Sequence, residues 1–228
     1  MLPSPLQEIE TYTRAVFQGK LACQIDSCPR CGARPGHFTR HALRPRVFLA
    51  VVGGWVRRLA SFVTRYRCPV CGATFTDYPA FVRPRRRYVT ATILEGAGRY
   101  LHEDAATYRD VVATEGGRPT FYGAPAERTA AADPAIDDRA LAPSTVWRWL
   151  AWLAALGRWV DATKRLIREA SSRAFARAWP VAPRKARSPD RKRLLDRAAE
   201  LVHVAARFRA VFPRSSIFTG LATAREGG

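Results

Sequence analysis

Two short cysteine motifs constrain the fold of this chain more than any other feature of its sequence. Cys28-Pro-Arg-Cys31-Gly and Cys68-Pro-Val-Cys71-Gly each place two cysteines three positions apart, with glycine directly after. Two such corners facing each other supply the four thiolates of a tetrahedral Zn²⁺ site. Proline stiffens each turn, and glycine permits the left-handed backbone that directs amide hydrogens toward the sulfurs. The repeat therefore predicts a zinc site formed by Cys28, Cys31, Cys68 and Cys71.

We expect this zinc to be structural. A catalytic zinc ion keeps one coordination position for water, and four thiolates leave none open. A structural ion would fold a domain too small to hold a core by itself. Three further residues, Cys23, His37 and His41, lie near the motifs. A small buried thiol is the favoured reading of the first, and strand polar residues or phosphate contacts are the favoured reading of the histidines.

The charge of the chain favours a polyanionic partner. Its 38 Lys and Arg against 19 Asp and Glu give a formal net charge of +19 over 228 residues. Nucleic acid and an anionic membrane surface both attract such a protein. We favour nucleic acid, because so high a charge is rare on solvated enzyme surfaces. The predominance of Arg and Ala would also fit a GC-rich genome.

The apolar runs predict no membrane partner. The longest, Val47–Val56, is about ten residues and contains Gly53-Gly54, so it is too short to span a bilayer. Residues 1–10 include two glutamates and lack the apolar segment of a secretory signal. We therefore expect a soluble, cytoplasmic and nucleoid-associated protein, whose paired cysteines hold metal in a reducing compartment.

Apolar periodicity predicts an α+β chain that begins with β structure around the cysteines. Residues 1–24 are a partly helical lead-in, and residues 25–82 form a small zinc ribbon. Its expected strands are rich in β-branched and aromatic residues. They cover residues 37–41, 47–52, 62–67 and 74–76.

From residue 88 the apolar period becomes helical. Residues 83–157 are predicted to form a mainly α, helix-turn-helix-like region with a loop insertion at 115–143. Residues 158–228 are predicted to form amphipathic helices that pair subunits or recruit a partner, followed by a loose tail. The expected helices cover residues 89–101, 105–114, 144–178 with a break at Gly157, and 190–212.

Two groups of residues are candidate DNA contacts. Four arginines next to Pro84 suit phosphates or a minor groove, with a solvated linker as the alternative reading. The helix predicted to begin at an N-cap, Ser144, would place its first turn in a major groove. The candidates are Arg83, Arg85, Arg86 and Arg87 for phosphates, and Ser144, Thr145 and Arg148 for bases.

Several aromatic and apolar residues accompany the second group. We expect Val146, Trp149 and Leu150 to pack behind the first turn of that helix. For Trp147 and Trp152, packing in the core or against a partner helix is favoured over a DNA contact, because a tryptophan on a helix contributes most through burial.

The cysteine motifs, with Arg65-Tyr-Arg-Cys-Pro-Val-Cys-Gly-Ala-Thr-Phe75 around the second, resemble the zinc ribbon at the front of many bacterial insertion-sequence transposases. Such ribbons precede a helix-turn-helix, and the pair is similar to small DNA-binding proteins of mobile elements. The resemblance covers about residues 25–157. It implies binding to element ends or an operator, with a transposase or recombinase as partner. This chain differs in having some thirty residues where a short turn precedes the recognition helix.

These features predict a sequence-directed, double-stranded DNA-binding protein, an accessory or regulatory factor of a mobile element that is not an enzyme. A transposase core needs strands that carry separated Asp, Asp and Glu residues, and no strand is predicted after Thr76. The apolar stripes of the last helices predict a homodimer or a complex with a transposase. Two alternatives stay open: an RNA-binding or ribosome-associated zinc-ribbon protein, and a subunit of a split transposase that depends on Asp104, Asp110 or Glu115.

Overall fold

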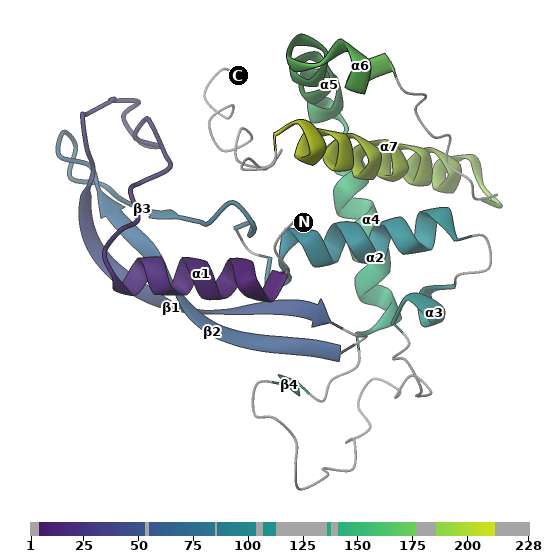
Figure 1. Ribbon diagram of the computed structural model, residues 1–228, viewed down its shortest axis with the longest axis horizontal. Coiled ribbons are helices and arrows are strands. Elements are labelled where there is room, and N and C mark those ends of the chain that lie inside the picture. The colour runs from purple at the N-terminus through teal and green to yellow at the C-terminus, as the bar shows by residue number, and fades with distance from the viewer. Residues whose placement is uncertain are drawn as a thin grey trace, which may run out of the picture. The chain divides into compact units, whose positions relative to one another are not determined.

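The computed structural model confirms the α+β class and divides the chain into two compact units (Figure 1). We call residues 1–50, 58–90 and 218–228 the hairpin unit, and residues 51–57 and 91–217 the helical unit. The structure describes residues 5–52, 55–84, 86–103, 107–112, 136–137, 141–176 and 186–212.

The hairpin unit consists of one helix and the strands that carry the cysteine motifs. Its elements are α1 (Pro5–Phe17), β1 (Thr39–Val52), β2 (Trp55–Arg67) and β3 (Thr74–Asp77), in the sheet order β1-β2-β3. The end of β1 and the start of β2, within residues 51–57, belong to the helical unit. β2 and β3 pair antiparallel, with Thr64 opposite Asp77 and Arg67 opposite Thr74. The second cysteine motif therefore forms the connection between two paired strands.

β1 is longer than the sequence indicated. Two short strands were predicted at 37–41 and 47–52, whereas one strand runs without interruption from Thr39 to Val52. Pro45 lies inside it, and proline is tolerated in a strand where its missing N–H faces no partner strand. The predicted return strand at 74–76 is confirmed as β3.

The core of the hairpin unit lies between α1 and the hairpin. Ile9 is 1% exposed and packs with Phe48, which is fully buried. Tyr12 and Phe48 both meet the ring of Phe81 edge to face, with ring centroids 5.4 and 5.5 Å apart. This small aromatic cluster holds the helix against the strands.

The helical unit contains six helices and one short strand among its described residues. They are α2 (Thr90–His102), α3 (Tyr108–Val112), β4 (Ile136–Asp137), α4 (Pro143–Ala155), α5 (Arg158–Ala170), α6 (Ser172–Ala176) and α7 (Pro189–Val211). β4 pairs antiparallel with Val56 and Arg57 of β2. The prediction of no strand after Thr76 is therefore wrong; a strand of two residues is too short to leave a periodic pattern.

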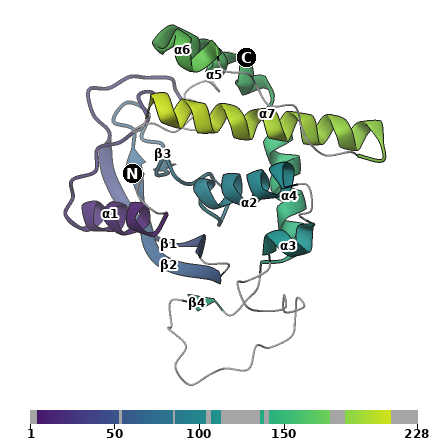
Figure 2. The ribbon, with the colours of Figure 1, turned by 45° about the vertical axis from the view of Figure 1, so that its right-hand side comes forward.

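α4 is central to the helical unit and crosses both α2 and α7 (Figure 2). A Cβ atom added at Gly96 of α2 would lie 2.7 Å from Cζ3 of Trp149. The glycine thus allows α2 to approach the indole more closely than any other residue could. The predicted apolar stripes are buried here: Ile93, Ala97, Leu101, Val146, Trp149, Leu150, Leu153, Leu195, Ala198, Leu201 and Ala205.

The ends of the helices confirm some predictions and correct two. The helix predicted over 144–178 has a second break, because the extended backbone of Ser171 ends α5 at Ala170 and α6 follows. The expected break at Gly157 separates α4 from α5, and α7 matches the helix predicted at 190–212. Ser144, however, is not an N-cap. Ala142 occupies that position and Pro143 the first turn, where its fixed φ and missing N–H favour helix initiation.

Helices long and apolar enough to cross a membrane are absent from the part of the chain that the structure describes.

Candidate metal centre and nucleic-acid interface

The two cysteine corners have the same backbone geometry. The Gly32 amide donates to the Cys28 carbonyl at 2.9 Å, and the Gly72 amide donates to the Cys68 carbonyl at 3.0 Å. Both glycines have a left-handed backbone, with φ of 68° and 69°. Since a side chain at such a φ is strained, each motif ends in the residue that its turn requires.

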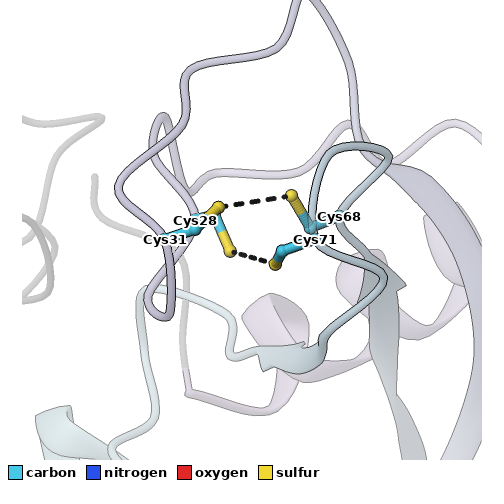
Figure 3. A group of neighbouring side chains, drawn as sticks. All are labelled: Cys28, Cys31, Cys68 and Cys71. Carbon is cyan, nitrogen blue, oxygen red and sulfur yellow. Dashed lines mark hydrogen bonds between the residues drawn. The ribbon is translucent and has the colours of Figure 1, made fainter.

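The four sulfurs of the corners face one another (Figure 3). Sγ of Cys28 lies 3.7 Å from that of Cys71, and Sγ of Cys31 lies 3.9 Å from that of Cys68. All four lie within 4.8 Å of one another. A tetrahedral ion with Zn–S bonds of about 2.3 Å separates its sulfurs by about 3.8 Å. The spacing of the four sulfurs therefore fits a tetrahedral metal ion with metal–sulfur bonds of about 2.3 Å.

The local electrostatics of the thiols favour a bound cation. The amides of Cys31 and Arg30 point at Cys28 and lower the pKa of its thiol to about 6. The Ala33 amide acts in the same direction on Cys31, but the neighbouring sulfur of Cys71, together with burial, outweighs it and raises that pKa to about 12. Four thiolates so close repel one another, and a divalent ion would allow all four to be deprotonated.

An aromatic cluster supports the sulfurs. Phe38 meets Phe75 edge to face at 4.9 Å between centroids, and Tyr66 stacks on Phe75 at 6.3 Å. Buried Cys28 and Cys68 pack into the same cluster. The packing of this small aromatic cluster and a bound metal ion would together stabilise the corners.

The three residues considered as further ligands lie outside the sulfur cluster. In the described chain, only the four corner cysteines form a group of three or more donors close enough to share an ion. Cys23 is half-buried, with its thiol directed at the Ile25 carbonyl. His37 and His41 are both exposed.

Three of the arginines near Pro84, namely Arg83, Arg86 and Arg87, belong to a hydrogen-bonded turn beside β1. The Arg86 amide donates to the Arg83 carbonyl at 3.1 Å, and Arg46 donates from Nη2 to the Arg86 carbonyl at 2.9 Å. The next residues run parallel to β1, where Leu49 bonds to Arg87 and Val89, each at 2.9 Å. We call Arg83, Arg86 and Arg87 the arginine turn. Arg87 is exposed, and Arg85 lies outside the described residues.

The first turn of α4 carries the other predicted contacts. Ser144 and Arg148 are exposed, whereas Thr145 is half-buried. Behind them Val146, Trp149 and Leu150 are buried, as predicted. Trp147 is 48% exposed, so it is not a core residue of the described chain, and Trp152 is half-buried. The arginine turn and this helix belong to different units.

α3 contacts α4. α3 has only five residues, and some thirty residues separate it from α4. The Asp110 carboxylate accepts a hydrogen bond from the Thr107 amide, and Thr107 Oγ1 accepts from the Asp110 amide at 3.3 Å. This reciprocal pair caps α3. Asp104 and Glu115 lie outside the described residues.

Two polar features of the hairpin unit were missed from the sequence. Asp77 is 9% exposed and accepts a hydrogen bond from the Gln24 amide at 2.9 Å. Burial is the main reason that its pKa is raised. The second feature is an open groove at the corners, lined in part by Arg30 and Thr74. The signal for the groove was present, because arginines flank both motifs.

The fold and the sulfur geometry together define an α+β protein with a four-cysteine candidate metal centre. No protein-family model, no curated protein and no solved structure matches this chain.

Proposed function

We propose that this protein binds double-stranded DNA through its hairpin unit, in which a structural Zn²⁺ ion joins the two cysteine corners of a zinc ribbon. The observation that carries the proposal is the arginine turn, which is hydrogen-bonded to the edge of β1 and so presents Arg87 from a defined position. The backbone of this turn is held in place, and contacts from Arg to phosphates supply most of the affinity of such proteins.

The charge of the hairpin supports this proposal. Between Cys28 and Asp77 the sequence contains nine arginines, and its single acidic residue is Asp77 itself. Asp77 is buried, and therefore contributes little negative potential at the surface. A surface with arginines and few carboxylates attracts a polyanion.

Zinc is the ion that the donor set supports best. Four thiolates are soft ligands, which exclude the oxygen-binding ions Mg²⁺ and Ca²⁺. Zn²⁺ is common in tetrahedral four-sulfur sites, where no position stays open for water. We therefore assign the ion a structural role and propose that the protein is not an enzyme.

We further propose that the first turn of α4 reads bases in a helix-turn-helix-like manner. Ser144 and Arg148 are exposed beside a buried stripe, so that the helix could present them while it stays packed on α7. Arg148 would bond to guanine or to a phosphate. The support is the exposure of these side chains and the contact between α3 and α4.

The resemblance of the cysteine motifs to insertion-sequence ribbons supports a role as accessory factor of a mobile element. A transposase or recombinase would then be the protein partner, and the C-terminal helices would pair with it or with a second copy of this chain. A DNA partner would place the protein on the nucleoid.

The proposal is tested by measuring duplex affinity across a salt series. Arg83, Arg86 and Arg87 are replaced together by Gln. The plot of the logarithm of the association constant against the logarithm of the salt concentration should then become less steep, by roughly 0.9 for each phosphate that is no longer neutralised. The matched control replaces Arg165, Arg173 and Arg197, three exposed arginines of the helical unit, by Gln. Equal slopes for the two triple variants would contradict the proposal, and tighter binding to single-stranded RNA would favour the ribosome-associated alternative.

Base readout has a separate test. Selecting bound duplexes from a random pool should yield a motif for the wild type, and Arg148→Ala should lose the preference at one position. Arg165→Ala is the control of equal charge. If Arg148→Ala selects the same motif with equal strength, α4 does not read the bases.

A further inference from the structure

We propose that the groove between the two cysteine corners binds the sugar–phosphate backbone of duplex DNA, so that the metal centre forms part of the DNA-binding surface. This inference rests on the proposed function and adds a contact site that was not among the residues predicted from the sequence. It depends on residues distinct from the arginine turn.

The groove has two walls that come from different corners. We call it the corner groove. Pro29 and Arg30 of the first corner form one wall, and Gly72–Phe75, which follow the second corner, form the other. It is open to solvent and encloses about 500 Å³, within the range of roughly 300–1,000 Å³ that small ligands occupy. It is therefore large enough for a nucleotide unit and far larger than a single water.

One arginine lines the corner groove, and two more contact or approach residues of its wall. Arg30 lines it directly and is exposed. Arg67 is also exposed and lies beside Gly72. A Cβ atom added at Gly72 would be 3.6 Å from Nη2 of Arg67 and 4.0 Å from Nε of Arg67. Arg65 donates from Nη2 to Oγ1 of Thr74, which orients that hydroxyl in the wall.

The chemistry of the corner groove fits a phosphodiester with its sugar. Guanidinium groups and a threonine hydroxyl are among the donors that most often bond to DNA phosphates. Pro29 and Phe75 provide apolar surface for the deoxyribose. The contact proposed for the corner groove is with the sugar–phosphate backbone, so the site would position the duplex without selecting a sequence.

The two walls are far apart in the sequence, since Arg30 and Gly72 belong to separate motifs. The ion that joins the four sulfurs would hold the walls together. Metal binding and this DNA contact are therefore coupled: removal of the ion should abolish the corner groove and its contact with the duplex.

A competing explanation assigns the arginines to the metal alone. Four thiolates around Zn²⁺ carry a net charge of −2, and nearby guanidinium groups stabilise such a charge. On that explanation Arg30→Ala and Arg67→Ala would weaken zinc retention and leave DNA affinity unchanged. The two explanations differ in a measurable way.

The experiment uses the zinc-loaded full chain and a fluorescent duplex in an anisotropy titration across a salt series. The double variant Arg30→Ala/Arg67→Ala is compared with Arg34→Ala/Arg44→Ala, which removes two exposed arginines that do not line the groove. We expect the groove variant to bind more weakly than the control, with a salt slope smaller by roughly 0.9 to 1.8, and with one zinc per chain retained in both variants.

Two results would overturn the corner groove. One is equal affinity and slope in the two double variants. The other is a groove variant that loses zinc to a chelator faster than the control while DNA binding is unchanged. Failure of the proposed function would look different, because the wild type itself would then show no salt-dependent duplex binding. If the arginine-turn variant weakens binding and the groove variant does not, only the groove assignment fails.

Discussion

The hairpin unit packs α1 against its strands through a small cluster around Phe48 and Phe81, and a second cluster surrounds the sulfurs. In the helical unit, by contrast, α4 and α7 bury continuous apolar stripes against each other. The second unit resembles an ordinary helical core, and the first would need an ion to close its corners. The comparison suggests a division of roles: apolar stripes stabilise the helical unit, whereas the proposed metal ion would stabilise a small sheet whose sequence carries mainly positive charge.

The first prediction separates the two units by their dependence on metal, and it is the largest. Cys68→Ser should remove a ligand that is worth a sizeable part of the roughly 10–16 kcal/mol of structural zinc binding in small domains. Hydrogen exchange should lose protection in β1, β2 and β3 while α4 and α7 keep theirs. Cys23→Ser is the control, because Cys23 lies outside the sulfur cluster. Loss of protection in both units together would contradict the comparison.

The second prediction concerns the contact between α2 and α4. Gly96→Ala should destabilise the helical unit by about 1–3 kcal/mol, because the new Cβ would overlap the Trp149 ring. Denaturant unfolding measures the change in the free energy of unfolding.

The matched control for this prediction is a second glycine of the same helix. A Cβ at Gly98 would lie 3.5 Å from Cγ1 of Val202, an ordinary contact. Gly98→Ala should therefore stabilise the helix by about 0.4–1 kcal/mol. Equal effects of the two substitutions would show that Trp149 does not pack closely on Gly96.

The third prediction is a smaller pH effect in the hairpin unit. Burial raises the pKa of Asp77, so the folded chain binds this proton more tightly than the unfolded chain. Between the ordinary carboxyl pKa and the raised value, the free energy of unfolding should fall as pH rises. Asp77→Asn should raise stability at neutral pH and remove this dependence. A variant that is less stable than the wild type at neutral pH would contradict the prediction.

The fourth prediction has the opposite sign and concerns the helical unit. Burial, followed by the nearby Arg207 and His102, lowers the pKa of His203 below its usual 6.5. The free energy of unfolding should therefore decline as the pH falls from the usual histidine pKa through the lowered pKa of His203, because the folded chain resists protonation of this side chain. His203→Gln should flatten this part of the stability profile. An unchanged profile would show that His203 does not titrate differently on folding.

Patterns in the sequence predicted the parts of the molecule that depend on repeated spacing. The cysteine positions specified the sulfur cluster, because each corner carries its own proline and glycine. The stripes of α2 and α7 were equally clear, since apolar residues at helical spacing must be buried together. Arg148 is exposed, and its predicted contact with DNA stays a prediction.

Features that depend on tertiary packing could not be predicted in this way. The start of α4 was shifted because Ser144 looks like an N-cap, while Pro143 favours helix initiation one residue earlier. The pairing of the arginine turn with β1 depends on Leu49, roughly forty residues earlier in the sequence, and no local pattern reports it. The corner groove likewise needs both corners in place.

The most direct test of the central claim, that a metal-held hairpin unit binds DNA, compares duplex binding by the full chain with zinc and after chelation, with helical content followed by circular dichroism. We predict that chelation weakens duplex binding at least as much as the triple substitution of the arginine turn, while most helical signal persists, and that added zinc restores binding. Unchanged affinity and salt slope after complete removal of the metal would contradict the account.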